Sequence, residues 1–201
     1  MNRIAKASVC TILSLALILA GCSVSWINTA LADLPVITQV ALNIASIVAA
    51  ADGGQVSPAV ATQVQAIANQ VKSDLTLVQS LITSYQSATA AEQPGIVQKI
   101  SAALSDVQSN LNAILTAVHV NDAALQATIV AAVGVAVTTV ASIVSLLPAS
   151  PAPASASSSA SAKSTHVAKT RSAIKPPSAS QLKKQFNAIF AANGFPQAQV
   201  K

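Results

Sequence analysis

The sequence has few aromatic and few charged side chains. Aromatic residues make up 2% and charged residues 8% of the 201 residues, whereas 52% are hydrophobic, chiefly alanine and valine. So little charge excludes the highly charged class of disordered protein for the chain as a whole. The aromatic residues are Trp26, Tyr85, Phe186, Phe190 and Phe195. A core of small aliphatic side chains favours closely packed helices.

Cysteine is also scarce, and its position matters more than its number. The two cysteines are Cys10 and Cys22. Arg3 and Lys6 precede an apolar run over about residues 9–20, and small residues follow at its end, just before Cys22. A basic start, a short apolar run and small residues are the layout of a secretory signal peptide. The run is also shorter than the roughly 20 residues that a membrane-spanning helix needs.

The apolar run ends in Leu19-Ala20-Gly21-Cys22, which resembles the lipobox of bacterial lipoproteins. The resemblance implies that residues 1–21 are a signal peptide, cut between Gly21 and Cys22. It also implies a diacylglycerol on the Cys22 sulfur, and usually an acyl chain such as palmitate on its new amine. This covalent lipid is the only prosthetic group that we expect. No domain family is recognised in the remaining residues.

A lipid on Cys22 would decide where the protein resides. Each buried methylene contributes about 0.8 kcal/mol, so two or three acyl chains hold a protein at a membrane far longer than one does. In Gram-negative lipoproteins, an Asp directly after the acylated cysteine commonly keeps the protein in the inner membrane. This chain has Ser23 at that position, which favours attachment to the periplasmic side of the outer membrane. The alternative is an ordinary secreted protein. With Cys10 removed and Cys22 acylated, the mature chain has no thiol for a disulfide.

Residues 22–34 are interpreted as an anchor segment, and residues 35–147 as an up-down bundle of four helices. The first helix covers residues 35–51, with Pro35 in its first turn and Gly53-Gly54 after its end. The second begins at Ser57-Pro58, an N-cap followed by a favourable first residue. Its apolar positions recur about every 3.6 residues up to Tyr85: Val60, Val64, Ile67, Val71, Leu75, Val78 and Ile82.

The third and fourth helices complete the predicted bundle. The third begins either at a capping box formed by Thr89 and Glu92 or at Pro94, and extends to about Val118. The fourth begins at Asn121-Asp122, because an acid both caps a helix and suits its N-terminus.

The fourth helix carries no charge over residues 123–147, so it also fits a membrane span. We expect a helix of the bundle instead, with Thr128, Thr138, Ser142 and Ser145 on a small-residue outer side. Gly134 is interpreted as a close-packing site. If the helix did insert, the protein would be membrane-active, for example pore-forming.

The composition changes at Pro148. Residues 148–179 are rich in Pro, Ala and Ser with scattered bases, which predicts a disordered basic linker. Ser180 then caps a short amphipathic helix within residues 180–201, ended by Asn193-Gly194. Its candidate docking residues are Leu182, Lys183, Lys184, Phe186, Ile189, Phe190 and Phe195. The helix could bind a partner, pack on its own bundle or bind a membrane surface.

Charge is divided along the chain. Residues 22–147 hold six acidic and two basic side chains, whereas residues 148–201 hold seven basic and no acidic ones. Such a tail attracts anionic envelope polymers, lipids or an acidic protein surface, and a lipid-anchored protein seldom meets nucleic acid. The C-terminal Lys201 offers one more alternative, because an abundant helical lipoprotein is crosslinked to peptidoglycan through a terminal lysine.

The sequence predicts no enzyme. The acids, among them Asp33, stand near helix ends and on polar faces, and no Cys/His/Asp cluster has metal-ligand spacing. No glycine-rich phosphate loop follows a strand. We therefore expect a non-enzymatic, lipid-anchored helical protein of the cell envelope, acting as a structural or binding module with a basic docking tail.

Overall fold

A computed structural model describes residues 4–51, 56–118, 122–148 and 177–200, with side chains from Ser25 onward except that of Gln197. Within these residues the chain forms five α-helices and one short 3₁₀ helix, without strands. The predicted all-α class is therefore confirmed. The linker predicted at 148–179 lies mostly outside the described residues.

The first helix, α1, is much longer than expected. It covers Ile4–Ala49 and passes through Pro35, so the prediction that a helix begins at Pro35 is wrong. Proline lacks the N–H that would bond to the carbonyl of Leu31. Pro35 and Leu31 are both exposed, so the missing hydrogen bond lies on the exposed side of α1. Buried side chains on both sides of the proline, such as Leu34 and Val36, stabilise the continuous helix.

The next two helices follow their local signals. Helix α2 covers Pro58–Ser87, and the Ser57 hydroxyl accepts a 3.3 Å hydrogen bond from the Val60 N–H, as predicted. Helix α3 covers Gln93–Ala117 and begins between the two predicted starts. The Glu92 carboxylate accepts hydrogen bonds from the backbone N–H of Thr89 at 2.9 Å and from its hydroxyl at 2.8 Å. These bonds lower the pKa of Glu92.

Helix α4 covers Ala123–Leu146 and begins where the sequence predicts. One carboxylate oxygen of Asp122 accepts from the backbone N–H groups of Ala124 and Leu125, at 2.8 and 3.1 Å. An acceptor at this point satisfies donors that have no partner within the helix.

Helix α5 covers Ala179–Ala192, and its cap is Ser178, so the predicted cap at Ser180 is wrong. Ser178 has Gln181 three residues later, and the two form a reciprocal capping box, which Ser180 followed by Lys183 cannot form. The helix ends at Asn193-Gly194 as predicted. Gly194 has φ +86°, a conformation open to glycine, and a 3₁₀ helix, η1, follows at Pro196–Ala198.

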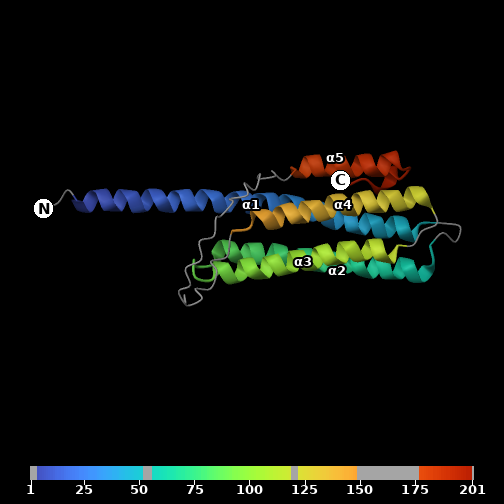
Figure 1. Cartoon of the computed structure of the whole chain (residues 1–201), viewed down its shortest axis with the longest axis horizontal. Coiled ribbons are helices and arrows are strands. Elements are labelled where there is room, and N and C mark those ends of the chain that lie inside the picture. The colour runs from blue at the N-terminus through green and yellow to red at the C-terminus, as the bar shows by residue number, and fades with distance from the viewer. Residues whose placement is uncertain (1–3, 52–55, 119–121, 149–176, 201) are drawn as a thin grey trace, which may run out of the picture.

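The five helices lie side by side, and α1 to α4 alternate in direction (Figure 1). Helix α2 packs on α1 and α3, while α4 packs on α3 and α1. Helix α5 lies on α1 and α4, parallel to α1 (Figure 1). The N-terminal part of α1 projects beyond the other helices (Figure 1). We call the packed part, α1 from Trp26 together with α2 to α5, the helical body.

A single core of small aliphatic side chains occupies the helical body. The largest fully buried residues are Leu34, Ile37, Ile44, Leu75, Ile82, Ile100, Leu104, Leu111, Ile114, Ile129, Phe186 and Phe190. Trp26 and Tyr85 meet edge to face at the end from which α1 projects, with ring centroids 5.4 Å apart. Each large buried side chain contributes roughly 1.5–3 kcal/mol before entropy is counted.

Candidate functional site

The predicted lipidation and cleavage residues, Cys22 and Gly21, lie on the backbone of α1, in its part without described side chains. Among the described side chains the core begins at Trp26, which is 2% exposed. Cys22 is therefore one helical turn before the first of these buried residues.

The residues predicted for docking at the C-terminus divide by burial. Leu182, Phe186 and Phe190 are completely buried in the core, and Ile189 and Phe195 pack against it. Of the three arrangements left open by the sequence, the structure shows α5 packed on its own helical body. Lys183 is half-buried and Lys184 is exposed, so the basic residues remain available at the surface.

Asparagine side chains fix the end of the described chain. The Asn187 carboxamide pairs with the backbone of Val200, accepting its N–H at 2.7 Å and donating to its carbonyl at 3.3 Å. Asn43 on α1 donates to the Ala198 carbonyl at 2.6 Å. Lys201, the candidate for wall attachment, lies outside the described residues.

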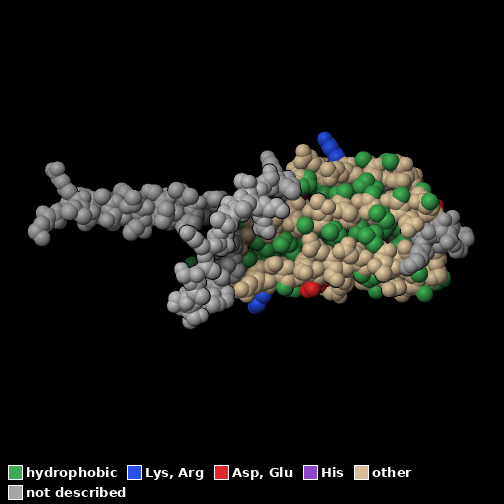
Figure 2. All heavy atoms as spheres, viewed as in Figure 1, with side chains coloured by type: hydrophobic (Ala, Val, Ile, Leu, Met, Phe, Trp, Pro, Cys, Tyr) green, Lys and Arg blue, Asp and Glu red, His purple; other side chains and the backbone are tan. Residues whose placement is uncertain are grey.

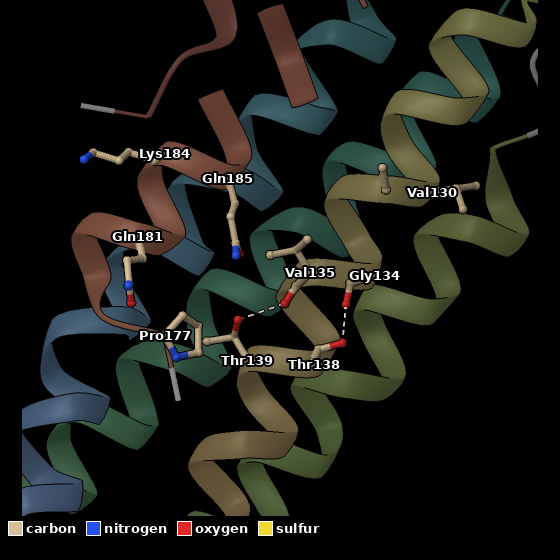
Figure 3. Close-up of a pocket in the computed structure, with 10 residues that line it drawn as sticks. Val130, Gly134, Val135, Thr138, Thr139, Pro177, Gln181, Lys184 and Gln185 are labelled. Carbon is tan, nitrogen blue, oxygen red and sulfur yellow. Dashed lines mark hydrogen bonds between the residues drawn. The ribbon is translucent and has the colours of Figure 1, made fainter. Parts of the chain in front are cut away.

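A groove of about 770 Å³ lies open between α4 and α5. Figure 3 shows it, with α4 contributing one side and α5 the other. The α4 side is formed by Val130, Ala131, Gly134, Val135, Thr138 and Thr139. The α5 side is formed by Pro177, Gln181, Lys184 and Gln185. Its volume is within the range of about 300–1,000 Å³ that small-molecule sites occupy.

The hydroxyls in the groove already have partners. Thr138 donates to the Gly134 carbonyl and Thr139 to the Val135 carbonyl, each at 2.8 Å (Figure 3). Gln185 points toward α4, whereas the Lys184 ammonium points away from it (Figure 3). The threonine hydroxyls on the α4 side have therefore already donated their hydrogen bonds. On the α5 side the Gln181 oxygen accepts from Ser178 in the capping box, and the charged group is the Lys184 ammonium.

The outer side of α4 differs from its prediction. The sequence predicts Thr128 and Ser142 there, but both are buried. Each hydroxyl donates to a carbonyl of its own helix, at 2.8 and 2.9 Å, so neither is left without a partner in the core. Val130 is 51% exposed instead. The predicted close packing at Gly134 is also wrong, since a Cβ built there meets nothing within 4 Å. Figure 2 shows few charged side chains on this face of the molecule.

Asp33 is a buried acid that the sequence placed on a polar face. It is 1% exposed, and neither carboxylate oxygen has a hydrogen-bond partner among the described residues. Burial raises the pKa of Asp33 to about 6. The indole nitrogen of Trp26 is likewise buried without a partner there. The signal was present, because Asp33 stands seven residues after Trp26, two helical turns along the same apolar face.

Among the described side chains, no group of three or more His, Cys, Asp or Glu is placed to hold a metal ion. Two described helical segments, Ser25–Ala49 and Ala123–Leu146, are long and apolar enough to cross a membrane, judged by length and composition.

No protein-family model matches the chain, and neither a curated protein nor a solved structure matches it significantly.

Proposed function

We propose that this protein is a lipid-anchored, non-enzymatic component of the bacterial cell envelope. In this proposal Cys22 carries the lipid, and α1 to α4 form an up-down four-helix bundle that faces the periplasm. Helix α5 docks on that bundle, and the basic residues of the tail meet anionic partners in the envelope. The protein acts there as a structural or binding module.

One relationship carries the proposal: the lipobox lies just outside the helical body. The N-terminal part of α1 projects beyond the other helices (Figure 1), and the described core begins at Trp26. A cut between Gly21 and Cys22 would therefore remove the projecting part and leave the described core complete. The same cut would put the acyl chains one turn from the packed helices, and so hold the bundle close to the bilayer.

The test is acylation of the full chain in a bacterium fed an alkyne analogue of palmitate. The chain should take up the label and have a mature N-terminus at Cys22 by mass spectrometry. Cys22→Ala should abolish both, whereas Cys10→Ala should change neither, because Cys10 leaves with the signal peptide. Labelling that survives Cys22→Ala, or residues 1–21 retained on the mature chain, would overturn the proposal.

A second candidate is insertion of α4 into the membrane. It rests on a comparison of the two apolar segments. In the most apolar stretch of α4, 39% of the residues are buried by the other helices, whereas 56% are buried in the α1 segment, so more of α4 is left to face a bilayer. The outward side of α4 also carries no charge over residues 123–147. A pore-type or other membrane-active role would follow from insertion.

Replacing the lipobox with an ordinary cleavage site separates the two candidates. The triple change Leu19→Ala, Gly21→Ala and Cys22→Ser places small residues before the cut and removes the acylated sulfur. The lipid-anchor proposal predicts release into the soluble periplasmic fraction. If the cleaved chain stays in the membrane after a carbonate wash, α4 insertion is supported instead.

A further inference from the structure

The groove between α4 and α5 combines an apolar side with a single kind of charge. From α4 it receives Val130, Ala131, Gly134 and Val135. It also receives Thr138 and Thr139, whose hydroxyls donate to carbonyls of their own helix. Val130 is half exposed, which is unusual in this structure, where exposed large hydrophobic side chains are few among the described residues. An exposed apolar side chain beside a groove gains free energy when a ligand covers it.

Gly134 keeps the groove open. A Cβ built on this residue meets no other atom within 4 Å, so the missing side chain leaves space that no neighbour takes. Glycine costs an exposed helix about 1 kcal/mol relative to alanine. Here the absent side chain leaves the backbone of α4 accessible from the groove.

The charges around the groove have one sign. Lys184 is the charged residue that lines it, and Lys183 is its neighbour on α5. Residues 123–147 and 177–200 hold no acid at all. The Gln181 and Gln185 carboxamides supply further donors beside Lys184. A ligand that is apolar along its length and anionic at one end complements this arrangement.

We propose that the groove binds a non-esterified long-chain carboxylate. The hydrocarbon chain would lie along the α4 side, and the carboxylate would meet Lys184 and the glutamine amides at the mouth. The Lys184 ammonium points away from α4 (Figure 3), but its flexible four-carbon stem lets it turn to a carboxylate at the rim. This activity does not depend on the lipid on Cys22.

The test uses the full chain in its own membranes and a palmitate analogue with a diazirine in the alkyl chain. The membranes are washed free of ATP and coenzyme A, so that the probe is not esterified. After irradiation, mass spectrometry should place the crosslinks on α4 and α5 around Gly134. Unlabelled palmitate in excess should compete.

Two matched pairs of variants make the test specific. Gly134→Leu fills the groove and should reduce crosslinking to background, whereas Ala127→Leu, at an exposed position of α4 outside the groove, should not. Lys184→Gln should weaken probe binding by about two- to fivefold, the range of an exposed ion pair, and Lys183→Gln should weaken it less. If Gly134→Leu fails to fold by circular dichroism, the lysine pair still decides.

Three outcomes would overturn the proposal. The first is crosslinking that Gly134→Leu leaves unchanged. The second is equal loss in Lys183→Gln and Lys184→Gln. The third is equal labelling of the same residues by a phosphatidylcholine analogue in vesicles, which would mean that α4 contacts bilayer hydrocarbon without selecting a carboxylate.

Discussion

The side chain of Asn187 pairs with the backbone of Val200 through both its oxygen and its nitrogen, at 2.7 and 3.3 Å. The two residues lie thirteen positions apart and join the last part of α5 to the segment that contains Gly194 and η1. Val200 is buried as a result, and Asn43 on α1 holds Ala198 in the same segment. The described C-terminal residues are therefore a fixed part of the helical body.

Asn187→Ala should destabilise this segment. Two partly buried hydrogen bonds are lost, each with a net contribution of about 0.5–1.5 kcal/mol, and the Val200 backbone groups lose their partners. We expect the free energy of unfolding to fall by about 1–3 kcal/mol in chemical denaturation. Gln185→Ala, at an exposed position of the same helix, is the control and should change it little. Equal stability of both variants would show that the pairing does not hold the segment.

Stability should depend on pH through Asp33. Its pKa is raised from 3.8 to about 6 in the folded protein, so folding favours the protonated form. The pH-dependent loss of stability is therefore absent below about pH 4, grows between about pH 4 and 6, and stays constant above pH 6. The pKa differs by about two units between the unfolded and folded protein, and each unit corresponds to about 1.4 kcal/mol. The free energy of unfolding should therefore be about 3 kcal/mol lower above pH 6 than below pH 4.

Asp33→Asn should remove this dependence and raise stability at pH 7, because a neutral amide costs less to bury than a carboxylate. The measurement is urea denaturation between pH 4 and 8, taken as the difference between variant and parent. Asp106→Asn, at an exposed position of α3, serves as control. A difference that does not change with pH would contradict the buried, unpaired state of Asp33.

Phe186→Ala tests the position of α5. Phe186 is completely buried, and truncation of such a side chain typically costs about 3–5 kcal/mol. We expect faster amide hydrogen exchange throughout α5 and a lower midpoint of thermal unfolding. Phe195→Ala should have a smaller effect, since Phe195 is only partly buried. If α5 existed only to bind a partner, neither variant would change the exchange of the isolated protein.

Pro35→Ala tests the continuity of α1. The alanine restores an N–H that can bond to the Leu31 carbonyl within the helix. Proline in a helix interior costs about 3 kcal/mol relative to alanine, so stability should rise by up to that amount. Ala32→Pro, at another exposed position of the same helix, should lower it. A loss of stability in Pro35→Ala would mean that the proline is needed to begin a helix.

Local signals in the sequence determined most helix ends. Ser57, Asp122 and Gly194 each act through hydrogen bonds or dihedral angles within a few residues, so their effects are readable without the fold. The apolar periodicity of α2 likewise identified its buried face from Val64 to Tyr85. The cap of α5 was readable in principle, because Ser178 and Gln181 stand at capping-box spacing.

Only the tertiary structure decided what depends on residues distant in sequence. Proline tolerance at Pro35 and the docking of α5 both follow from packing between helices, which has no local signature. The groove is the clearest case, because neither α4 nor α5 contains it alone. The side chains that line it come from two helices about fifty residues apart in the sequence. The free energy gained when such distant residues pack together outweighs the local conformational preference of either segment.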